Sequence, residues 1–329
     1  MPVRAKVRAM DTSLLAELQS SIARHCPADA TPFRPLSHVI LMSASSPTPP
    51  IAEVSEPMFA LVARGAKHLC LGDRVFDYGT GQYLIVSVDL PLEAHVSEAT
   101  LAEPFLGMGF TLSAEAIAAL LLETGTVQST TPDTLGIAVS NLTDDLIDPL
   151  IRLLRLVDRP ADIPVLAAAI EREILWRLIN GAQSALVRQI GFADSRMTQI
   201  GRAIRWIRGH YAEALRIDDL ARVAGMSMSS FHRHFQAVTS MTPIQYQKQI
   251  RLQTARTLLM SATEDVVAVG FAVGYESPSQ FSREYRRQFG EAPGKDRQRL
   301  RQMKEVDRGY TSGSASRRRV KAQTVGEES

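Results

Sequence analysis

Two stretches of the chain share one pattern, SMSSFHRHFQAVTSMTP at residues 227–243 and SPSQFSREYRRQFGEAP at residues 277–293. Serine, serine, aromatic, arginine, aromatic and proline occur in the same order, and each match is separated by 50 residues. Three upstream matches are separated by 49 residues: Ile217 with Val266, Leu220 with Val269, and Ala221 with Gly270. An internal repeat with one extra residue at its turn indicates two copies of one supersecondary unit.

Each copy has the pattern of a helix-turn-helix. The two motifs are expected at about residues 216–237 and 264–287. Gly225 and Gly274 follow the two first helices, where a residue without a Cβ permits a tight turn. Ser227 and Ser277 precede the second helices and can cap their free amide groups, and Pro278 suits the first helical position. These residues predict where each second helix begins.

The second helix of each copy is predicted to have one buried and one exposed face. The buried face is predicted from aromatic spacing, Phe231 with Phe235 and Phe281 with Tyr285, and Met228 extends it in the first copy. The opposite face is small, polar and basic: Ser229, His232, Arg233 and Gln236 in the first copy, and Ser279, Gln280, Ser282, Arg283 and Arg286 in the second. Serine can approach base edges closely, and arginine can bind guanine O6 and N7 together. A solvated amphipathic helix has a similar pattern, but its occurrence twice in register favours contact with a DNA major groove.

Charge is distributed unequally along the chain, although the formal net charge is only +2. Residues 1–194 have a net charge of −8, residues 195–303 of +8, and residues 304–329 of +2. A basic module attached to an acidic one predicts that only the C-terminal part binds a polyanion. Random variation of surface charge is the alternative explanation.

The first 190 residues have a different pattern from the rest. Residues 1–50 contain an amphipathic helical stretch and lead into a proline-rich segment, SASSPTPPIAEVSEP, which predicts an exposed lead-in. Residues 51–190 are expected to form the next domain. Within it, short apolar runs separated by glycines from Pro57 to Leu112, with a turn at Gly72-Asp73, predict an antiparallel sheet or barrel.

Further helices are predicted after these strands, at residues 113–125, 145–157 and from 163 to about 189. The last of them could be a dimer interface or a core helix. Residues 195–300 are expected to form a helical domain that contains both helix-turn-helix motifs. Residues 301–329 have no apolar periodicity, which predicts a disordered tail.

Composition narrows the class of protein further. The 45% of hydrophobic and 22% of charged residues are typical of proteins that build apolar cores. Neither a signal peptide nor a membrane span is expected, because no sufficiently long apolar run is present. Cys26 and Cys70 form no metal-binding pattern, so neither a disulfide framework, nor a metal site, nor another cofactor is expected. We therefore expect a cytoplasmic protein with reduced thiols.

The two C-terminal segments FHRHFQAVTSMTP (231–243) and VGYESPSQFSREYRRQFGEAP (273–293) resemble the signature segments of AraC/XylS-type regulators. The resemblance implies a linker helix at about residues 244–260 and two recognition helices in successive major grooves. It also implies positions for base contacts: Ser229, His232 and Arg233, then Ser279, Gln280, Ser282 and Arg283. Three residues depart from the family pattern. Ser240 replaces a usual glycine, Gly270 a usual alanine, and Asp296 a usual aromatic residue, and the last two predict a looser second motif.

The segment from Glu56 to Ala99 is similar to the N-terminal sensory domain of one AraC-type subfamily, which implies a small cupin-like barrel followed by helices. Metal-binding cupins need clustered histidines, whereas His68 and His95 are isolated in the sequence, so a metal or enzymatic cupin is not expected. His68 and Cys70 alternate with Leu69 and Leu71, so one pair is expected inside and the other outside. Ordinary packing is the simpler interpretation of His68 and Cys70, and a redox role for Cys70 is an alternative.

The sequence thus predicts an α+β protein with an N-terminal small cupin-like β-barrel and helices, and a C-terminal all-α domain with two helix-turn-helix units. It predicts a non-enzymatic transcription activator that binds double-stranded DNA and responds to a small-molecule effector. RNA polymerase is a further expected partner, and the family resemblance favours a homodimer. Two alternatives stay open: control by abundance or a protein partner, and a cupin enzyme fused to a DNA-binding domain.

Overall fold

The computed structural model describes residues 11–27, 32–126, 135–192, 195–261 and 265–299. The chain divides into two compact units, one of residues 1–209 with 216–246, the other of residues 210–215 with 247–329. The disordered tail expected at residues 301–329 lies outside the described residues.

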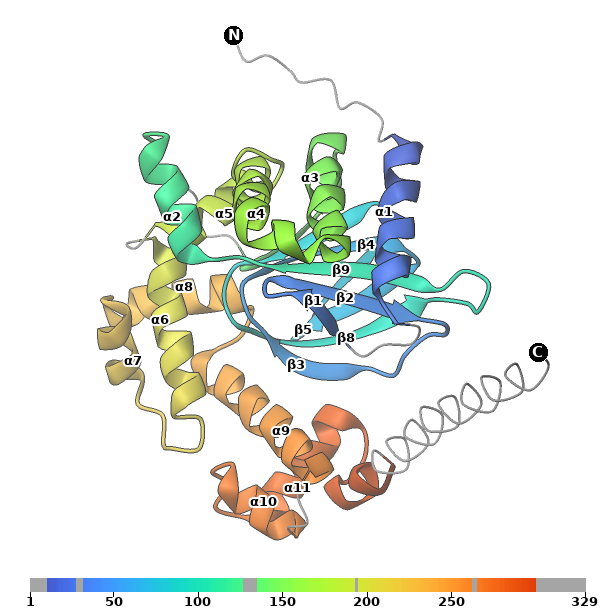
Figure 1. Ribbon diagram of the computed structural model, residues 1–329. Helices are drawn as coiled ribbons and strands as arrows, with labels where there is room; N and C mark the ends of the chain where they lie inside the picture. The colour runs from blue at the N-terminus through green and yellow to red at the C-terminus, as the bar shows by residue number, and fades with distance from the viewer. Residues whose placement is uncertain (1–10, 28–31, 127–134, 193–194, 262–264, 300–329) are drawn as a thin grey trace, which may run out of the picture. The chain divides into compact units, whose positions relative to one another are not determined.

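The first unit contains two antiparallel sheets (Figure 1). Their strands are β1 (Phe33–Leu36), β2 (Val39–Ala44), β3 (Ile51–Ser55), β4 (Met58–Arg64), β5 (Ala66–Leu71), β6 (Arg74–Gly79), β7 (Gln82–Val86), β8 (Leu90–Glu98), β9 (Phe105–Thr111) and β10 (Ile137–Asn141). One sheet has the strand order β1-β2-β9-β4-β7-β10 and the other the order β3-β8-β5-β6. We call these ten strands together the two-sheet region.

The predicted alternation of side chains is visible in β5. Leu69 and Leu71 are buried, at 4% and 0% exposure, whereas His68 and Cys70 lie on the opposite, partly exposed face. Gly72 has φ of +59°, a left-handed conformation that glycine tolerates, and it makes the expected turn into β6. The question that the sequence left open is therefore answered: the leucines are inside.

Helices cover the outer side of the six-stranded sheet. In Figure 1, α1, α3 and α4 lie over this sheet, and α1 packs against β2, β4 and β9. The helices of the first unit are α1 (Thr12–His25), α2 (Ala114–Glu123), α3 (Asp144–Arg155), α4 (Ile163–Ile179), α5 (Ser184–Gly191), α6 (Arg196–Gly209), α7 (Ile217–Ala224) and α8 (Met228–Thr239). Short 3-10 turns at Leu156–Asp158 and Pro160–Asp162 connect α3 to α4.

The proline-rich segment is exposed at Pro47, Pro49 and Pro50, as the sequence predicts, but its two ends belong to strands. Residues before and after the prolines form β2 and β3, and Val39 and Leu41 in β2 are fully buried. Pro49 and Pro50 fall in the connection between these strands, where a missing amide donor disturbs no sheet hydrogen bond. The prolines therefore separate two strands.

The long helix predicted from residue 163 to about 189 is two helices, α4 and α5. The break follows Asn180, whose side chain donates to the Trp176 carbonyl at 2.9 Å and ends α4. Gly181 comes next, and glycine weakens a helix interior. The apolar stripe of α4 is buried at Ile170, Ile174, Leu178 and Ile179, but Leu166 at its start is 44% exposed.

The regular elements in the described part of the second unit are all helices. The helix α9 (Pro243–Ser261) matches the expected linker helix, and its residues from Gln247 onward belong to this unit. It is followed by α10 (Val266–Ala272) and α11 (Pro278–Phe289). The core of the unit consists of Leu252, Ala255, Leu259, Val269, Val273, Tyr275, Phe281 and Tyr285. The α+β fold class, with sheets in the N-terminal part and helices in the C-terminal part, is thus confirmed.

Candidate nucleic-acid interface

The first helix-turn-helix consists of α7 and α8. Gly225 ends α7 in the left-handed conformation, with φ of +68°. The Ser227 side chain caps α8 by accepting a hydrogen bond from the Ser230 amide, as the sequence predicts. Phe231 and Phe235 are fully buried, and α6 packs against both α7 and α8. These contacts fix the rotation of α8 about its axis.

The second helix-turn-helix consists of α10 and α11. Gly274 in its turn has φ of +88°, and a Cβ at this position would lie 2.2 Å from the Ala212 carbonyl oxygen. Ser277 caps α11 by accepting from the Gln280 amide, and Pro278 occupies the first turn. A side chain on residue 274 is therefore excluded by both conformation and space.

The polar residues predicted for base contact lie on exposed faces of α8 and α11. All are exposed except Ser282, which is half-buried: Ser229, His232 and Arg233 on α8, and Ser279, Gln280, Ser282 and Arg283 on α11. Met228, which the sequence pattern placed on the buried face, is instead 50% exposed. It occupies the first turn of α8, before the first buried residue of the helix, Phe231.

The candidate base-contacting side chains differ in how they are held. Arg233 lies with Nη2 3.3 Å from the Nε2 atom of the neighbouring His234. On α11, the side-chain Nε2 of Gln280 donates to Glu284 at 3.4 Å, and Glu284 also accepts from Lys248 at 3.1 Å and from the Tyr275 hydroxyl at 2.9 Å.

Glu284 holds the side chain of the candidate residue Gln280, a contact that the sequence reasoning missed. Burial by itself raises the pKa of Glu284, but its hydrogen bonds from Lys248, Tyr275 and Gln280 outweigh burial and hold the pKa below its usual value. The carboxylate is therefore charged at neutral pH and holds the Gln280 side chain in place. The spacing of four residues between Gln280 and Glu284 on one helix was the available signal.

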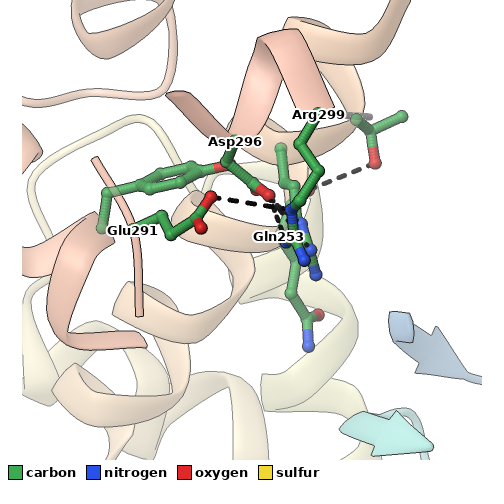
Figure 2. Close-up of polar contacts among 7 residues, drawn as sticks. Gln253, Glu291, Asp296 and Arg299 are labelled. Carbon is green, nitrogen blue, oxygen red and sulfur yellow. Dashed lines mark hydrogen bonds and ion pairs between the residues drawn. The ribbon is translucent and has the colours of Figure 1, made fainter. Parts of the chain in front are cut away.

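Asp296 closes the second motif with a buried ionic network instead of an aromatic side chain. It is fully buried and accepts hydrogen bonds from Arg256 at 2.9 Å, Arg299 at 2.6 Å and the Tyr285 hydroxyl at 2.8 Å. Figure 2 shows the Arg299 side chain next to both carboxylates, and its Nε also pairs with Glu291 at 3.6 Å. The carboxylate thus has charged and hydroxyl partners within the core, which gives a physical reason against the loosening expected at Asp296.

The other two departures from the family pattern also have local causes. A Cβ on Gly270 would lie 3.0 Å from the Phe281 ring, so glycine lets this ring pack closely against α10. Ser240 ends α8 with φ of +62°, in the region that favours glycine. This conformation explains why glycine suits the position. Because serine has a Cβ, the backbone of Ser240 is strained there.

The two histidines on strands of the two-sheet region, His68 and His95, lie close to each other, with one carboxylate beside His68. His68 lies with Nδ1 2.6 Å from Asp77, and its ring centroid is 4.9 Å from that of His95. No group of three potential metal-ligating side chains occurs among the described residues. Burial raises the pKa of the Cys70 thiol, and the nearby carboxylates of Glu93 and Asp77 raise it further. A raised pKa leaves less thiolate, which disfavours the redox role considered for Cys70.

No helix in the described part of the chain is both long and apolar enough to span a bilayer.

Comparisons with known proteins address both parts of the chain. Residues 35–186 match the family model described as the AraC-type transcriptional regulator N-terminus, and residues 220–299 match a helix-turn-helix domain model. The transcriptional activator RhaS of Escherichia fergusonii is 30% identical over 135 residues, which cover 40% of this chain and 48% of RhaS. The regulator ArgR of Pseudomonas aeruginosa is 28% identical over 152 residues, 45% of each protein. The chain thus spans about half the length of the curated relatives it matches.

The fold has solved counterparts as well. A structure of ToxT from Vibrio cholerae O395 aligns with a TM-score of 0.53 at 8% sequence identity, covering 80% of this chain and all of ToxT. At this identity the likeness concerns the fold alone. The sequence matches to both parts, in the order in which the sheets and the paired helix-turn-helix motifs occur, show that the chain belongs to the AraC/XylS family of transcription regulators.

Proposed function

We propose that this DNA-binding regulator is a sequence-specific activator that reads two successive major grooves, one with α8 and one with α11. The observation that carries the proposal is the pair of capped helices, each with buried aromatic residues on one face and exposed polar and basic residues on the other. Residues 195–300 would form the DNA-binding domain and residues 51–190 the sensory domain.

Arg233 and Arg283 carry the main base contacts in this proposal. Both are exposed, and each lies six positions after its capping serine. Each guanidinium would bind O6 and N7 of a guanine, and the shorter polar residues would contact adjacent base edges: Ser229, His232, Ser279, Gln280 and Ser282. Other basic residues of the domain would contact phosphates, which set position and affinity without sequence preference.

Activation is the proposed sign of regulation because curated relatives of the chain are named transcriptional activators. An activator needs a contact with RNA polymerase, which we propose as a second partner, and a cytoplasmic location follows from this role. No catalytic activity is proposed.

Ligand control and dimerisation are the proposed roles of the N-terminal part. ToxT, which shares the fold, has been solved with an unsaturated fatty acid bound. The helix α4 exposes Val165 at 74%, Leu166 at 44% and Trp176 at 39%, an apolar face suited to a second copy of the chain. Control by abundance or a protein partner is the alternative. A metabolite panel in thermal melting separates the two, because a ligand of the folded state raises the Tm.

The base contacts are tested by selecting bound sites from random DNA with Arg233→Ala and Arg283→Ala. Each variant should lose about 1–3 kcal/mol on the specific site and relax one base preference, the two positions lying about one helical turn apart. Arg222→Ala is the matched control, because Arg222 is an exposed arginine on α7, outside the recognition helix. It should keep the selected motif.

Two variants that select the wild-type motif and merely bind all DNA more weakly would contradict the proposed reading. Such a result assigns both arginines to phosphates, with the slope of log affinity against log salt reduced by about one.

A further inference from the structure

A cleft of about 600 Å³ lies within the first unit, between α6 and the two-sheet region. Its volume is in the range of small-molecule sites, roughly 300–1,000 Å³. The lining comes from the ends of strands, the start of α2, the end of α5 and one side of α6: Glu56, Pro57, Ser87, Val88, Asp89, Thr111, Leu112, Ala114, Ile190, Met197, Thr198, Gly201, Arg205, Arg208 and Gly209.

The floor of this cleft is apolar. Val88, Leu112, Ile190 and Met197 are all nearly buried, with at most 6% exposure, and contribute aliphatic or thioether surface. The hydroxyl of Thr198 is already used, donating to the Phe192 carbonyl at 2.8 Å. A ligand on this floor would therefore gain mainly from burying its own apolar surface.

Four charged residues line the same cleft, and they are unequally paired. Arg208 lies with Nη1 2.6 Å from the Asp89 carboxylate, and the charge of exposed Glu56 also acts on Arg208. Arg205 is exposed, and among the described residues it has neither an ion pair nor a hydrogen bond. The cleft thus has one guanidinium whose charge is balanced by neighbours and one that is available to an anion.

The position of Arg205 brings this available charge to the apolar floor. A Cβ built on Gly201 would be 3.5 Å from Arg205 Nη1 and 3.6 Å from Val88 Cγ1, so the guanidinium, Gly201 and Val88 are close neighbours. A molecule with an apolar body on the floor would hold its head group next to Arg205. Arginine and carboxylate match in geometry and can form two parallel hydrogen bonds.

We propose that this cleft is the effector site and binds an organic acid with an apolar body, whose carboxylate pairs with Arg205. The inference rests on the proposed ligand control and names its site and chemical class.

The walls of the cleft are joined directly to the first helix-turn-helix. The main-chain oxygen of Asp89 accepts a hydrogen bond from the buried Tyr246 hydroxyl at 2.8 Å. The Val238 carbonyl at the end of α8 accepts from the Gly136 amide at 2.8 Å, and the Gly136 carbonyl accepts from Ser87 in the cleft wall. A ligand that presses on α6 or on residues 87–89 would therefore act on α8 and its DNA affinity.

The experiment is a calorimetric titration of the full chain with octanoate, with octan-1-ol as the uncharged probe. Octanoate should bind, and octan-1-ol should bind about tenfold more weakly or worse because it lacks the charge that Arg205 pairs. Arg205→Met keeps an apolar stem and should weaken octanoate binding by about tenfold or more. Arg202→Met is the matched control, since Arg202 is exposed on α6 and does not line the cleft. It should bind octanoate like the wild type.

A competing site in the same region gives the experiment a second arm. Lys67 lies on β5 opposite the buried Tyr78, on the face that carries Leu69 and Leu71, and would be the cation of a site between the sheets. Loss of octanoate binding in Lys67→Met but not in Arg205→Met would overturn the proposal. Equal binding of octanoate and octan-1-ol would overturn it too. Phenylacetate, an aromatic acid, is titrated as a second probe, and the proposal is also overturned if neither octanoate nor phenylacetate binds.

DNA affinity is measured separately, with and without octanoate. This measurement distinguishes a failure of the proposed ligand control from a failure of the proposed site. An effect of octanoate on wild-type DNA affinity that disappears in Arg205→Met supports both the site and ligand control. Octanoate binding that depends on Arg205 but leaves DNA affinity unchanged supports the site and contradicts ligand control.

Discussion

Tyr246 and Asp296 occupy the same place in the two copies of the repeat, 50 residues apart, and close their motifs by different physical means. Tyr246 is fully buried and packs edge-on against Phe235, with ring centroids 5.6 Å apart. Asp296 is equally buried but is held by two arginines and a tyrosine hydroxyl. Equivalent helices can thus be closed by an apolar contact or by an ionic one.

Neighbouring substitutions explain how the ionic closure is tolerated. The position of Phe235 in the first copy is Tyr285 in the second, and its added hydroxyl donates to Asp296. Arg256, which also bonds Asp296, lies 4.6 Å from the centroid of the Phe289 ring, so part of the lost aromatic packing is replaced by a cation–π contact. Burying a charge is unfavourable unless its partners are present, so Asp296 depends on Tyr285, Arg256 and Arg299 together.

The largest expected effect concerns what the two motifs share. Phe231→Ala and Phe281→Ala should each destabilise the protein by about 3–5 kcal/mol, because both rings are fully buried. Urea unfolding of the full chain followed by circular dichroism measures the loss. The control is Phe271→Ala, since Phe271 is 53% exposed on α10 and should matter much less. If either core variant unfolds at the same urea concentration as the wild type, burial of that ring contributes nothing to the stability of the protein.

The next prediction concerns the difference between the two closures. Burial alone raises the pKa of Asp296, but hydrogen bonds from Arg299 and Tyr285 and the charge of Arg256 outweigh it and hold the pKa below its ordinary value. A lowered folded-state pKa contributes stability above the unfolded-state value and loses it as the pH falls through the folded-state value. Asp296→Asn should therefore cost about 2–3 kcal/mol at neutral pH.

The stability contributed by Asp296 should begin to fall below about pH 4, near the unfolded-state pKa, and should go on falling as the pH drops through the lower folded-state pKa, so the variant and the wild type should converge in acid. Tyr246→Phe is the counterpart in the first motif. It removes only the hydroxyl bond to the Asp89 carbonyl and should cost about 1 kcal/mol at every pH in this range. A constant gap between wild type and Asp296→Asn down to pH 3 would argue against an ionic closure.

A smaller effect should separate the two turns. Gly225 and Gly274 both have positive φ, but no atom lies within 4 Å of a Cβ built on Gly225, whereas the Ala212 carbonyl oxygen blocks one on Gly274. Gly225→Ala should cost about 1 kcal/mol for the left-handed conformation alone. Gly274→Ala should cost about 2 kcal/mol or more, because the backbone must move as well. Equal losses of unfolding free energy would mean that the second turn relaxes freely.

The smallest expected effect is a gain at the end of α8. Ser240 has φ of +62°, and the corresponding residue in the second motif is Gly290, with φ of +80°. Ser240→Gly should stabilise the protein by about 0.5–1 kcal/mol by removing side-chain strain, partly offset by the greater freedom of glycine in the unfolded chain. Gly290→Ser is the reverse substitution and should destabilise. Thermal melting of both variants checks the sign.

The sequence by itself determined the local features of both motifs. Capping serines, turn glycines and aromatic spacing act within a few residues, so Ser227, Gly225 and the Phe231–Phe235 pair could be placed without knowledge of the fold. The same reasoning indicated exposed polar faces on α8 and α11 and predicted the turn at Gly72.

Tertiary structure decided whatever depends on partners far away in the chain. The run around Val39 and Leu41 became a strand because β9 pairs with it, which no local pattern shows. Asp296 is satisfied by Arg256, 40 residues away in the sequence, and Arg208 meets Asp89 across 119 residues. Burial of a charge is favourable or costly according to the partners that the fold brings to it, and the sequence alone does not specify those distances.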